Sequence, residues 1–327
     1  MAGTRSRWTS VGMLALGLLL AGPVAAQIKV GITLSTTGPA ASLGIPEKNT
    51  VTLFPQQIAG HAVEYIVLDD ASDPTVAAVN TRRFIDEHRV DAIIGSTISP
   101  NSLAMIDAAA ESGTPMLSIA GASRIVEPMD DKRKWVFKTP QHDGLMAEGI
   151  IGHVADAGGR RLAVIAQSDA YGEGWLDELG KHAATRGVEL ATIERYNRTD
   201  TSVTAQALKL MATRPDAIVI VGAGTPAALP QKTLRERGYS GPIYQTHGVA
   251  NNDFLRVGGR DVEGTILPAG PVLVAAQLPD SAVKTVAIDY VERYEAAFGA
   301  DSVTTFGAHA WDAMLLLQNA IPAALER

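Results

Sequence analysis

The 327-residue chain contains no cysteine, few aromatic side chains and no apolar run long enough to span a bilayer. The absence of thiols excludes disulfides, thiolate metal or redox sites, and a lipid anchor carried on cysteine. The longest apolar run, residues 11–20 (VGMLALGLLL), is half of the roughly 20 residues that a membrane-spanning helix needs. We therefore expect no such helix in this chain.

The N-terminal residues have the layout of a secretory signal peptide. Arg5 and Arg7 precede the apolar run, and the small residues 23–26 follow it, which predicts cleavage after Ala26 rather than a membrane anchor. Removal of residues 1–26 leaves 26 basic and 35 acidic side chains, a formal charge of −9. The leader indicates a secreted protein, and such a mildly acidic surface is a poor one for binding nucleic acid.

Short β-branched runs alternate with amphipathic stretches of helical length along the rest of the chain. The runs are nearly all apolar and end at Gly, Asp, Ser or Pro, which predicts strands buried on both faces. Asp73 followed by Pro74 is a typical helix start, with an N-cap and a proline in the first turn. Repeated strand–helix units favour parallel sheets with helices on both faces. The predicted strands are residues 28–34, 63–68, 91–94, 115–119, 162–166, 217–221 and 243–245, and the predicted helices are residues 74–88, 102–112, 145–157, 174–186, 201–213, 227–237, 281–298 and 306–325.

The number of these units predicts two domains. About 300 residues follow the leader, which is more than one ordinary core accommodates. Residues 138–141 and 267–270 are the predicted crossovers between the domains. We expect a first lobe made of residues 27–140 plus 269–327, and a second lobe made of residues 141–268.

Loop motifs that follow the predicted strands occur in an order typical of one family. They are TGP at 37–39, LG at 43–44, DDASDP at 69–74, IIG at 93–95, TPMLS at 114–118, DAYGEG at 169–174 and RPDA at 214–217. Together they resemble the leucine/isoleucine/valine-binding group of type I periplasmic binding proteins, from about residue 28 to about residue 317. The run SLGIPEKN at 42–49 resembles the subgroup that takes up aromatic compounds.

The resemblance implies two doubly wound, Rossmann-like α/β lobes that close over a ligand by hinge bending. It also implies a monomeric, non-enzymatic component that hands its ligand to an inner-membrane ABC permease. The family has a third crossover followed by further second-lobe strands, which we do not find in this sequence; we expect the C-terminal part to be truncated. A periplasmic sensor subunit on the same fold remains an alternative, whereas an enzyme lacks a catalytic constellation.

Candidate ligand contacts in the first lobe come from the same resemblance. Ser99 aligns with a serine that binds the ligand carboxylate, although its place before a predicted helix also fits an N-cap. Ala120 matches a position whose carbonyl oxygen accepts a hydrogen bond from a ligand ammonium, and Ala122 offers a backbone N–H. Ser123 carries the hydroxyl that the family usually has one residue earlier. Leu43 stands where the family often has an aromatic residue. Its side chain packs either against the carbon atoms of the ligand or within its own loop.

In the second lobe, Tyr171 matches a cleft tyrosine, with helix-start packing as the alternative. Gly224 and Thr225 stand where amino-acid binders commonly carry a tyrosine, which predicts room for a larger ligand. His247 takes the place of an acidic residue that binds an α-ammonium. Arg124 is either a second positive charge for an acid or an ordinary surface arginine.

The exchange at His247 has a consequence for the ligand. A buried ammonium needs a nearby negative charge, because desolvation without a partner costs several kcal/mol. Imidazole supplies no negative charge but donates hydrogen bonds to oxygen. We therefore expect a carboxylate ligand without an α-ammonium, best an aromatic acid such as benzoate, a cinnamate relative or an aryl keto acid; branched-chain or other amino acids are the alternative.

Other chemistry is poorly supported by the sequence. No Gly-x-Gly-x-x-Gly, Walker, His-Glu-x-x-His or Gly-x-Ser-x-Gly pattern occurs, so we expect no cofactor, no metal and no catalysis. Asp69, Asp70 and Asp73 fit a capped turn better than a metal site.

Overall fold

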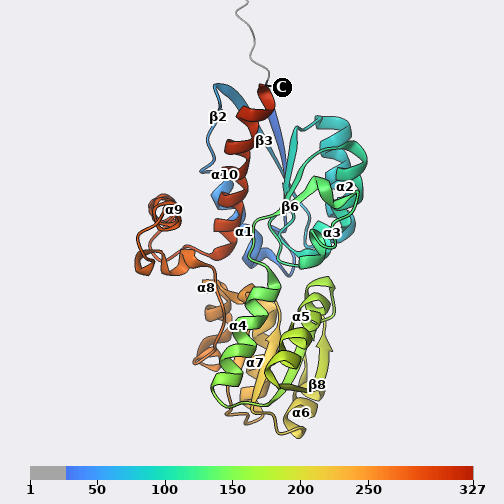
Figure 1. Ribbon diagram of the computed structural model, residues 1–327, viewed down its shortest axis with the longest axis vertical. Coiled ribbons are helices and arrows are strands. Elements are labelled where there is room, and N and C mark those ends of the chain that lie inside the picture. Colours follow the sequence, from blue (N-terminus) through green and yellow to red (C-terminus); the bar gives the residue numbers. More distant parts are fainter. Residues whose placement is uncertain (1–26, 327) are drawn as a thin grey trace, which may run out of the picture.

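A computed structural model describes residues 27–326 as two α/β lobes, one above the other in Figure 1. The predicted signal peptide, residues 1–26, lies outside the described residues. The chain passes from the upper lobe to the lower one and then returns, so both lobes contain segments that are distant in sequence (Figure 1).

The first lobe is built on a six-stranded sheet in the order β2-β3-β1-β4-β5-β6. All neighbouring strands are parallel except β2, which pairs antiparallel with β3. The strands are β1 Ile28–Leu34, β2 Gln57–Ile58, β3 His61–Asp69, β4 Ala92–Gly95, β5 Met116–Ser118 and β6 Val136–Lys138.

Two apolar cores lie on opposite faces of this sheet because side chains alternate along each strand. Ile94 and Leu117 join the core on one face, whereas Ile93 and Met116 join the core on the other. The first face is covered by α1 (Ala41–Val51) and α10 (Thr305–Leu325), and the second by α2 (Pro74–Arg83) and α3 (Ser99–Ser112). A π-helical turn, Phe84–His88, continues α2.

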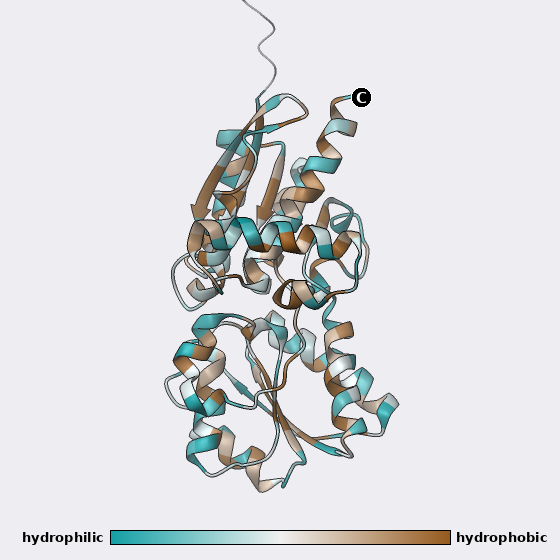
Figure 2. Cartoon of the chain, turned by 90° about the vertical axis from the view of Figure 1, so that its left-hand side faces the viewer, coloured by the Kyte–Doolittle hydropathy of each residue, from teal (hydrophilic) through white to brown (hydrophobic). Residues whose placement is uncertain are grey.

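The second lobe repeats this arrangement on a four-stranded parallel sheet in the order β10-β9-β7-β8. Val164 packs in the core beneath α4 and α5, and its neighbour Ile165 packs in the core beneath α6 and α7. Hydrophobic residues follow the strands of both lobes in Figure 2. The elements are β7 Arg161–Gln167, β8 Glu189–Tyr196, β9 Ala217–Val221, β10 Ile243–Gln245, α4 Asp143–Asp156, α5 Ala170–Arg186, α6 Thr204–Ala212 and α7 Ala228–Glu236.

The remaining segments connect the lobes or lie beside them. Helix α8 (Asn252–Gly258) belongs to the second lobe, and α9 (Ala282–Phe298) projects from the side of the first (Figure 1). Tyr290 of α9 holds this helix to α1, with its hydroxyl 2.9 Å from Thr50 Oγ1. The 3-10 turns are Ser123–Ile125, Arg133–Trp135, Thr225–Ala227, His247–Val249, Gly259–Val262 and Pro271–Gln277.

The predicted type I fold is confirmed, and Asp73 caps α2 by accepting hydrogen bonds from the next N–H groups. Three local predictions were wrong. Residues 41–51 form α1, where the sequence predicts a loop up to residue 44 and no helix; Pro46 lies inside this helix and its buried face is partly polar. Helix α3 begins at Ser99, three residues earlier than expected, and β8 was missed because its side chains are only partly buried.

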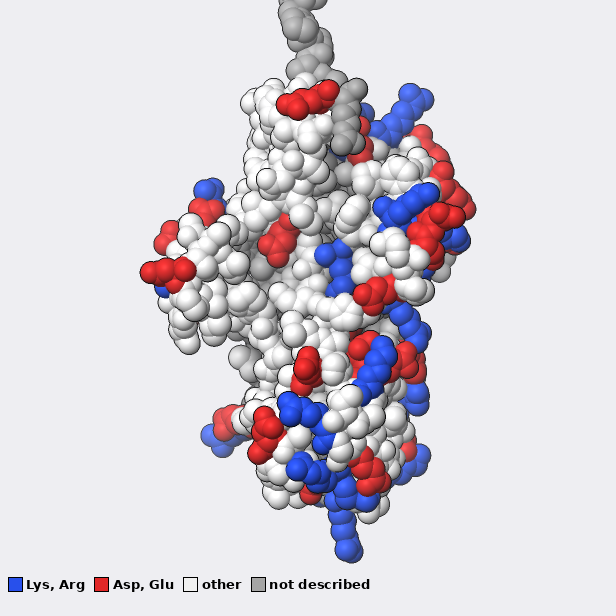
Figure 3. Space-filling model, viewed as in Figure 1, with Lys and Arg blue, Asp and Glu red and all other residues white. Residues whose placement is uncertain are grey.

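The described surface carries charges of both signs. On the face drawn in Figure 3, basic and acidic side chains are interspersed over both lobes and form no continuous basic band. Within residues 27–326, no helix combines the length and the apolar character that crossing a bilayer requires. The same residues contain no group of acidic, histidine or cysteine side chains arranged to hold a metal ion.

Candidate functional site

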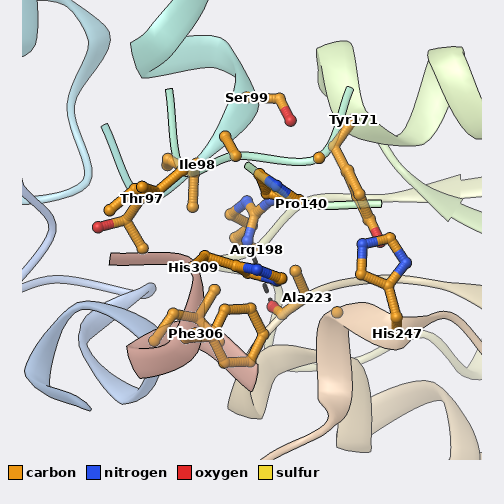
Figure 4. Close-up of a pocket in the computed structure, with 15 residues that line it drawn as sticks. Thr97, Ile98, Ser99, Pro140, Tyr171, Arg198, Ala223, His247, Phe306 and His309 are labelled. Carbon is orange, nitrogen blue, oxygen red and sulfur yellow. Dashed lines mark hydrogen bonds between the residues drawn. The ribbon is translucent and has the colours of Figure 1, made fainter. Parts of the chain in front are cut away.

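A small pocket with a cavity volume of about 30 Å³ lies between the lobes, where the carboxyl ends of strands from both sheets face each other (Figure 4). This is where ligands of open α/β sheets bind. Five residues predicted from the sequence line it: Leu43, Ser99, Ala120, Tyr171 and His247.

The first-lobe wall consists mainly of backbone, hydroxyl and aliphatic groups. Ser99 Oγ lies 3.2 Å from the backbone N of Ala122 and accepts its hydrogen bond. Ile98 occupies the N-cap position of α3, so Ser99 is the first helical residue and the N-cap alternative was wrong. Leu43 lies in α1 with a side chain 1% exposed, which places an aliphatic surface against the pocket.

Four predicted residues do not line this pocket. Ala122 is buried behind Ser99, and Ser123 borders a separate hollow at the exposed edge between the lobes. Gly224 and Thr225 face α1 of the first lobe, where the Thr225 N–H donates to Ser42 Oγ at 3.4 Å. Helix α1 therefore occupies the space that the sequence assigned to a larger ligand.

Arg124 is a surface residue. Its guanidinium donates to the carboxylate of Asp177 on α5, and about half of each side chain is exposed. The pair joins the two lobes outside the pocket, so Arg124 supplies no charge to a ligand there.

Tyr171 forms the centre of the second-lobe wall. Asp169 caps α5 by accepting hydrogen bonds from the Tyr171 and Gly172 N–H groups, which fixes the start of the helix. The Tyr171 hydroxyl donates to Thr246 Oγ1 at 2.9 Å, and that hydroxyl in turn donates to the Gly222 carbonyl. Burial raises the pKa of Tyr171, so the ring presents a neutral aromatic surface.

His247 lies beside this ring and is only 4% exposed. Its ring centroid is 6.2 Å from that of Tyr171 and 5.7 Å from that of Trp175. Burial, assisted by the positive charge of Lys138, lowers the pKa of His247 to about 4. The imidazole is therefore neutral at pH 7, with one nitrogen able to donate and the other to accept.

Asp143 is an acidic residue near the site that sequence reasoning missed. Its Oδ1 lies 3.9 Å from His247 Nε2, and the side chain is 1% exposed. Burial raises the pKa of Asp143 to about 8, against the opposing charge of Lys138. Asp143 is not among the residues that line the pocket, and burial favours the protonated form of its carboxyl. The site therefore does not present a second-lobe carboxylate of the kind that an ammonium requires.

Arg198 is the second residue that sequence reasoning missed. Its Nε donates to Asp169 Oδ2 at 2.8 Å and its Nη1 to the Ala223 carbonyl at 3.3 Å, while the guanidinium lines the pocket (Figure 4). Arg198 comes two residues after β8, so recognising that strand would have placed this cation at the cleft edge.

Helix α10 contributes two more rings, Phe306 and His309, which come from the returning segment of the first lobe (Figure 4). Burial lowers the pKa of His309 to about 3, so this imidazole is also neutral at pH 7. The pocket thus combines aromatic and aliphatic walls with neutral imidazoles and one guanidinium.

Two α/β lobes with a small pocket between them define a two-lobed solute-binding protein. The chain belongs to the periplasmic binding protein family, whose profile matches residues 27–326, and it has the type I fold of the leucine/isoleucine/valine-binding proteins. Proteins of this family are non-enzymatic solute binders.

An extracellular ligand-binding receptor from Rhodopseudomonas palustris HaA2 is 50% identical, with a TM-score of 0.89 over 92% of this chain and 84% of the receptor. A leucine-, isoleucine-, valine-, threonine- and alanine-binding protein from Pseudomonas aeruginosa is 22% identical over 73% of this chain; the match spans 65% of that relative's length. A solute-binding protein from R. palustris BisB5, solved with 3,4-dihydroxybenzoic acid, is 22% identical with a TM-score of 0.78, over 90% of this chain and 80% of its own. That last likeness concerns the fold alone.

Proposed function

We propose that the chain is the periplasmic substrate-binding component of an ABC importer and that its ligand is a small aromatic carboxylate. The observation that carries this proposal is the charge of the pocket. Among the described residues that line it, Arg198 is the only ionised side chain at pH 7, and none is Asp or Glu.

Arg198 provides the electrostatic reason to bind an acid. A guanidinium presents paired donors that match a carboxylate, and hydrogen bonds to charged groups contribute about 1.5–3 kcal/mol each. Asp169 already accepts from Nε, so the acid competes only for the donors that face the pocket. An ammonium at this position would be repelled and would lack a carboxylate partner.

The walls provide the reason to bind an aromatic acid. Tyr171 and Phe306 present rings, and Ile98 and Leu43 present aliphatic surface, on different sides of one pocket. Aromatic ligands pack well in such settings through offset or edge-to-face contacts. The R. palustris BisB5 protein shows that lobes of this fold can enclose 3,4-dihydroxybenzoic acid.

An amino acid is the second candidate, favoured by the buried carboxyl of Asp143 near His247 and by the ligands named for the Pseudomonas aeruginosa relative. Deprotonation of Asp143 on binding would supply the charge for an ammonium. The raised pKa of Asp143 disfavours this reading.

Calorimetric titration distinguishes the two candidates. The wild-type protein should bind benzoate or a hydroxybenzoate and should not bind leucine. His247→Asp, which introduces a carboxylate beside the pocket, should weaken acid binding by at least about tenfold. His247→Asn, of similar shape and neutral, is the matched control. Tight binding of leucine without binding of any aromatic acid would reject the proposal.

The cellular assignment extends this proposal. Residues 1–26 would direct export, and the closed, loaded protein would dock as a monomer on a membrane permease. Uptake of the bound acid by cells should then require both this gene and a permease gene. Loss of a transcriptional response to the acid, with uptake intact, would instead indicate the sensor role.

A further inference from the structure

Asp143 and His247 face each other across a narrow space beside Gly121. The distance from Asp143 Oδ1 to His247 Nε2 is 3.9 Å, which is too long for a direct hydrogen bond. A β-carbon placed on Gly121 would stand 3.2 Å from each of these two atoms. Gly121 also lines the inter-lobe pocket, so its missing side chain leaves this space accessible to a ligand.

Both carboxyl oxygens of Asp143 are fully buried and accept no hydrogen bond that the structure shows among the described residues, although the nearby Trp175 side chain opposes the rise in the pKa of this carboxyl. On the other side of the space His247 presents Nε2, while its other nitrogen, Nδ1, is buried without a partner in the described part of the chain. Lys138 does not bond to the carboxyl, because its Nζ donates to the carbonyl oxygens of Gly121, Pro140 and Gln141. Buried polar atoms are nearly always paired in folded proteins, so these oxygens call for a partner such as a water, an ion or a ligand group.

The geometry suits a single oxygen atom. An oxygen about 2.8 Å from each group fits between two atoms that are 3.9 Å apart, with an angle of about 90° between its two hydrogen bonds. A hydroxyl both donates and accepts, so it can donate to the carboxyl and accept from the imidazole N–H. A methyl group can do neither, and an ammonium can only donate.

We propose that Asp143 and His247 form a hydroxyl-binding subsite, reached past Gly121, which selects carboxylates that carry a phenolic hydroxyl. This inference rests on the proposed function, because the acid end of the ligand is assigned to Arg198. The subsite sets specificity among aromatic acids, whereas Arg198 sets the requirement for an acid.

Calorimetry on the full protein with matched acids tests the subsite. Benzoate, 3-hydroxybenzoate, 4-hydroxybenzoate and the corresponding methylbenzoates are titrated separately. At least one hydroxybenzoate should bind about tenfold or more tightly than benzoate, and its methyl counterpart should not. A polar subsite rejects analogues that leave its groups unpaired.

Two variants locate the effect. Gly121→Ala places a methyl group in the space and should reduce the preference for the hydroxyl to less than about twofold, measured as the ratio of hydroxybenzoate to benzoate affinity in that variant. Asp143→Ala removes the carboxyl that borders the space, and it should reduce the preference equally. If Gly121→Ala does not fold, Asp143→Ala decides alone.

The outcomes separate this inference from the proposed function. If the wild-type protein binds benzoate and all hydroxybenzoates with equal affinity, the subsite is overturned and the carboxylate proposal stands. The same holds if the preference for a hydroxybenzoate persists in Asp143→Ala. Leucine binding that is lost in Asp143→Ala assigns the carboxyl to an ammonium and overturns both. Failure to bind any aromatic acid also overturns both.

Discussion

The two walls of the inter-lobe pocket differ in chemistry. The first lobe contributes the Ser99 hydroxyl, the backbone around Ala120, the aliphatic side chain of Leu43 and, from α10, the rings of Phe306 and His309. The second lobe contributes the ring of Tyr171, the imidazole of His247 and the guanidinium of Arg198. The hydroxyl and backbone groups of the first wall can form hydrogen bonds with many small acids. The second wall carries Arg198, the ionised side chain of the lining, and its charge distinguishes one ligand class from another.

This difference follows from how each wall is built. Ser99 is placed by the start of α3, and its hydroxyl is already used by the Ala122 N–H, so its contribution to a ligand is limited. Arg198 and His247 lie on short segments after β8 and β10, where an exchange does not disturb a core strand. Substitutions at such loop positions can change ligand specificity with little effect on the stability of the fold.

The largest expected effect is the pH dependence of stability that His247 causes; His309 on the first wall, whose pKa is lowered to about 3, acts in the same direction. The unfolded chain protonates His247 below about pH 6.5, whereas the folded protein keeps it neutral down to about pH 4. The folded state therefore loses stability relative to the unfolded state as pH falls through this window. The difference in unfolding free energy between wild type and His247→Gln should change by about 3 kcal/mol, to the disadvantage of wild type.

Chemical denaturation at several pH values between 6.5 and 4 measures this difference. The comparison with a variant is needed because Glu47, Asp143 and Asp312 have raised pKa values, which act in the opposite direction. Ser99→Ala, on the first wall, is the control and should differ from wild type by an amount that does not depend on pH. A flat difference for His247→Gln would mean that this ring is not held neutral.

Arg198→Gln should give the next largest effect, now on affinity. Loss of the guanidinium should weaken binding of the aromatic acid by about 10- to 100-fold, because charge-assisted hydrogen bonds are lost. Arg124→Gln, which removes an exposed inter-lobe ion pair, is the control and should change affinity less than about threefold. Equal effects in the two variants would show that lobe closure, rather than contact with the acid, governs affinity.

Ser99→Ala should give the smallest effect. The hydroxyl already accepts one hydrogen bond from the protein, so its loss should weaken ligand binding by about fivefold. Titration calorimetry at one pH is sufficient to measure it. A loss as large as that in Arg198→Gln would contradict the contrast between the walls, since the first would then carry an equal share of the recognition.

The sequence predicted the architecture well because buried strands have a strong local signature. Runs such as residues 217–221 are apolar throughout and correspond to β9. By contrast, β8 has partly exposed side chains, and α1 contains Pro46 and a partly polar buried face, so neither has a clear periodic pattern.

The site was predicted less completely, for a related reason. Leu43, Ser99, Ala120, Tyr171 and His247 could be placed from motifs that follow recognised strands. The sequence predicted open space beside Gly224, but α1 of the opposite lobe fills it. Contacts between lobes leave no local pattern in the sequence, so this packing could not be predicted. Asp143 and His309 approach the site through tertiary packing from two different helices, which residue spacing alone does not reveal.

Trp175 gives the second lobe an intrinsic optical probe. Of the tryptophans that the structure describes, it is the one on α5, fully buried, with Tyr171 and His247 as its ring neighbours. Its emission depends on the polarity and charge within a few ångströms, and those neighbours form the wall that a ligand contacts. Ligand binding should therefore change the native fluorescence of the unlabelled protein.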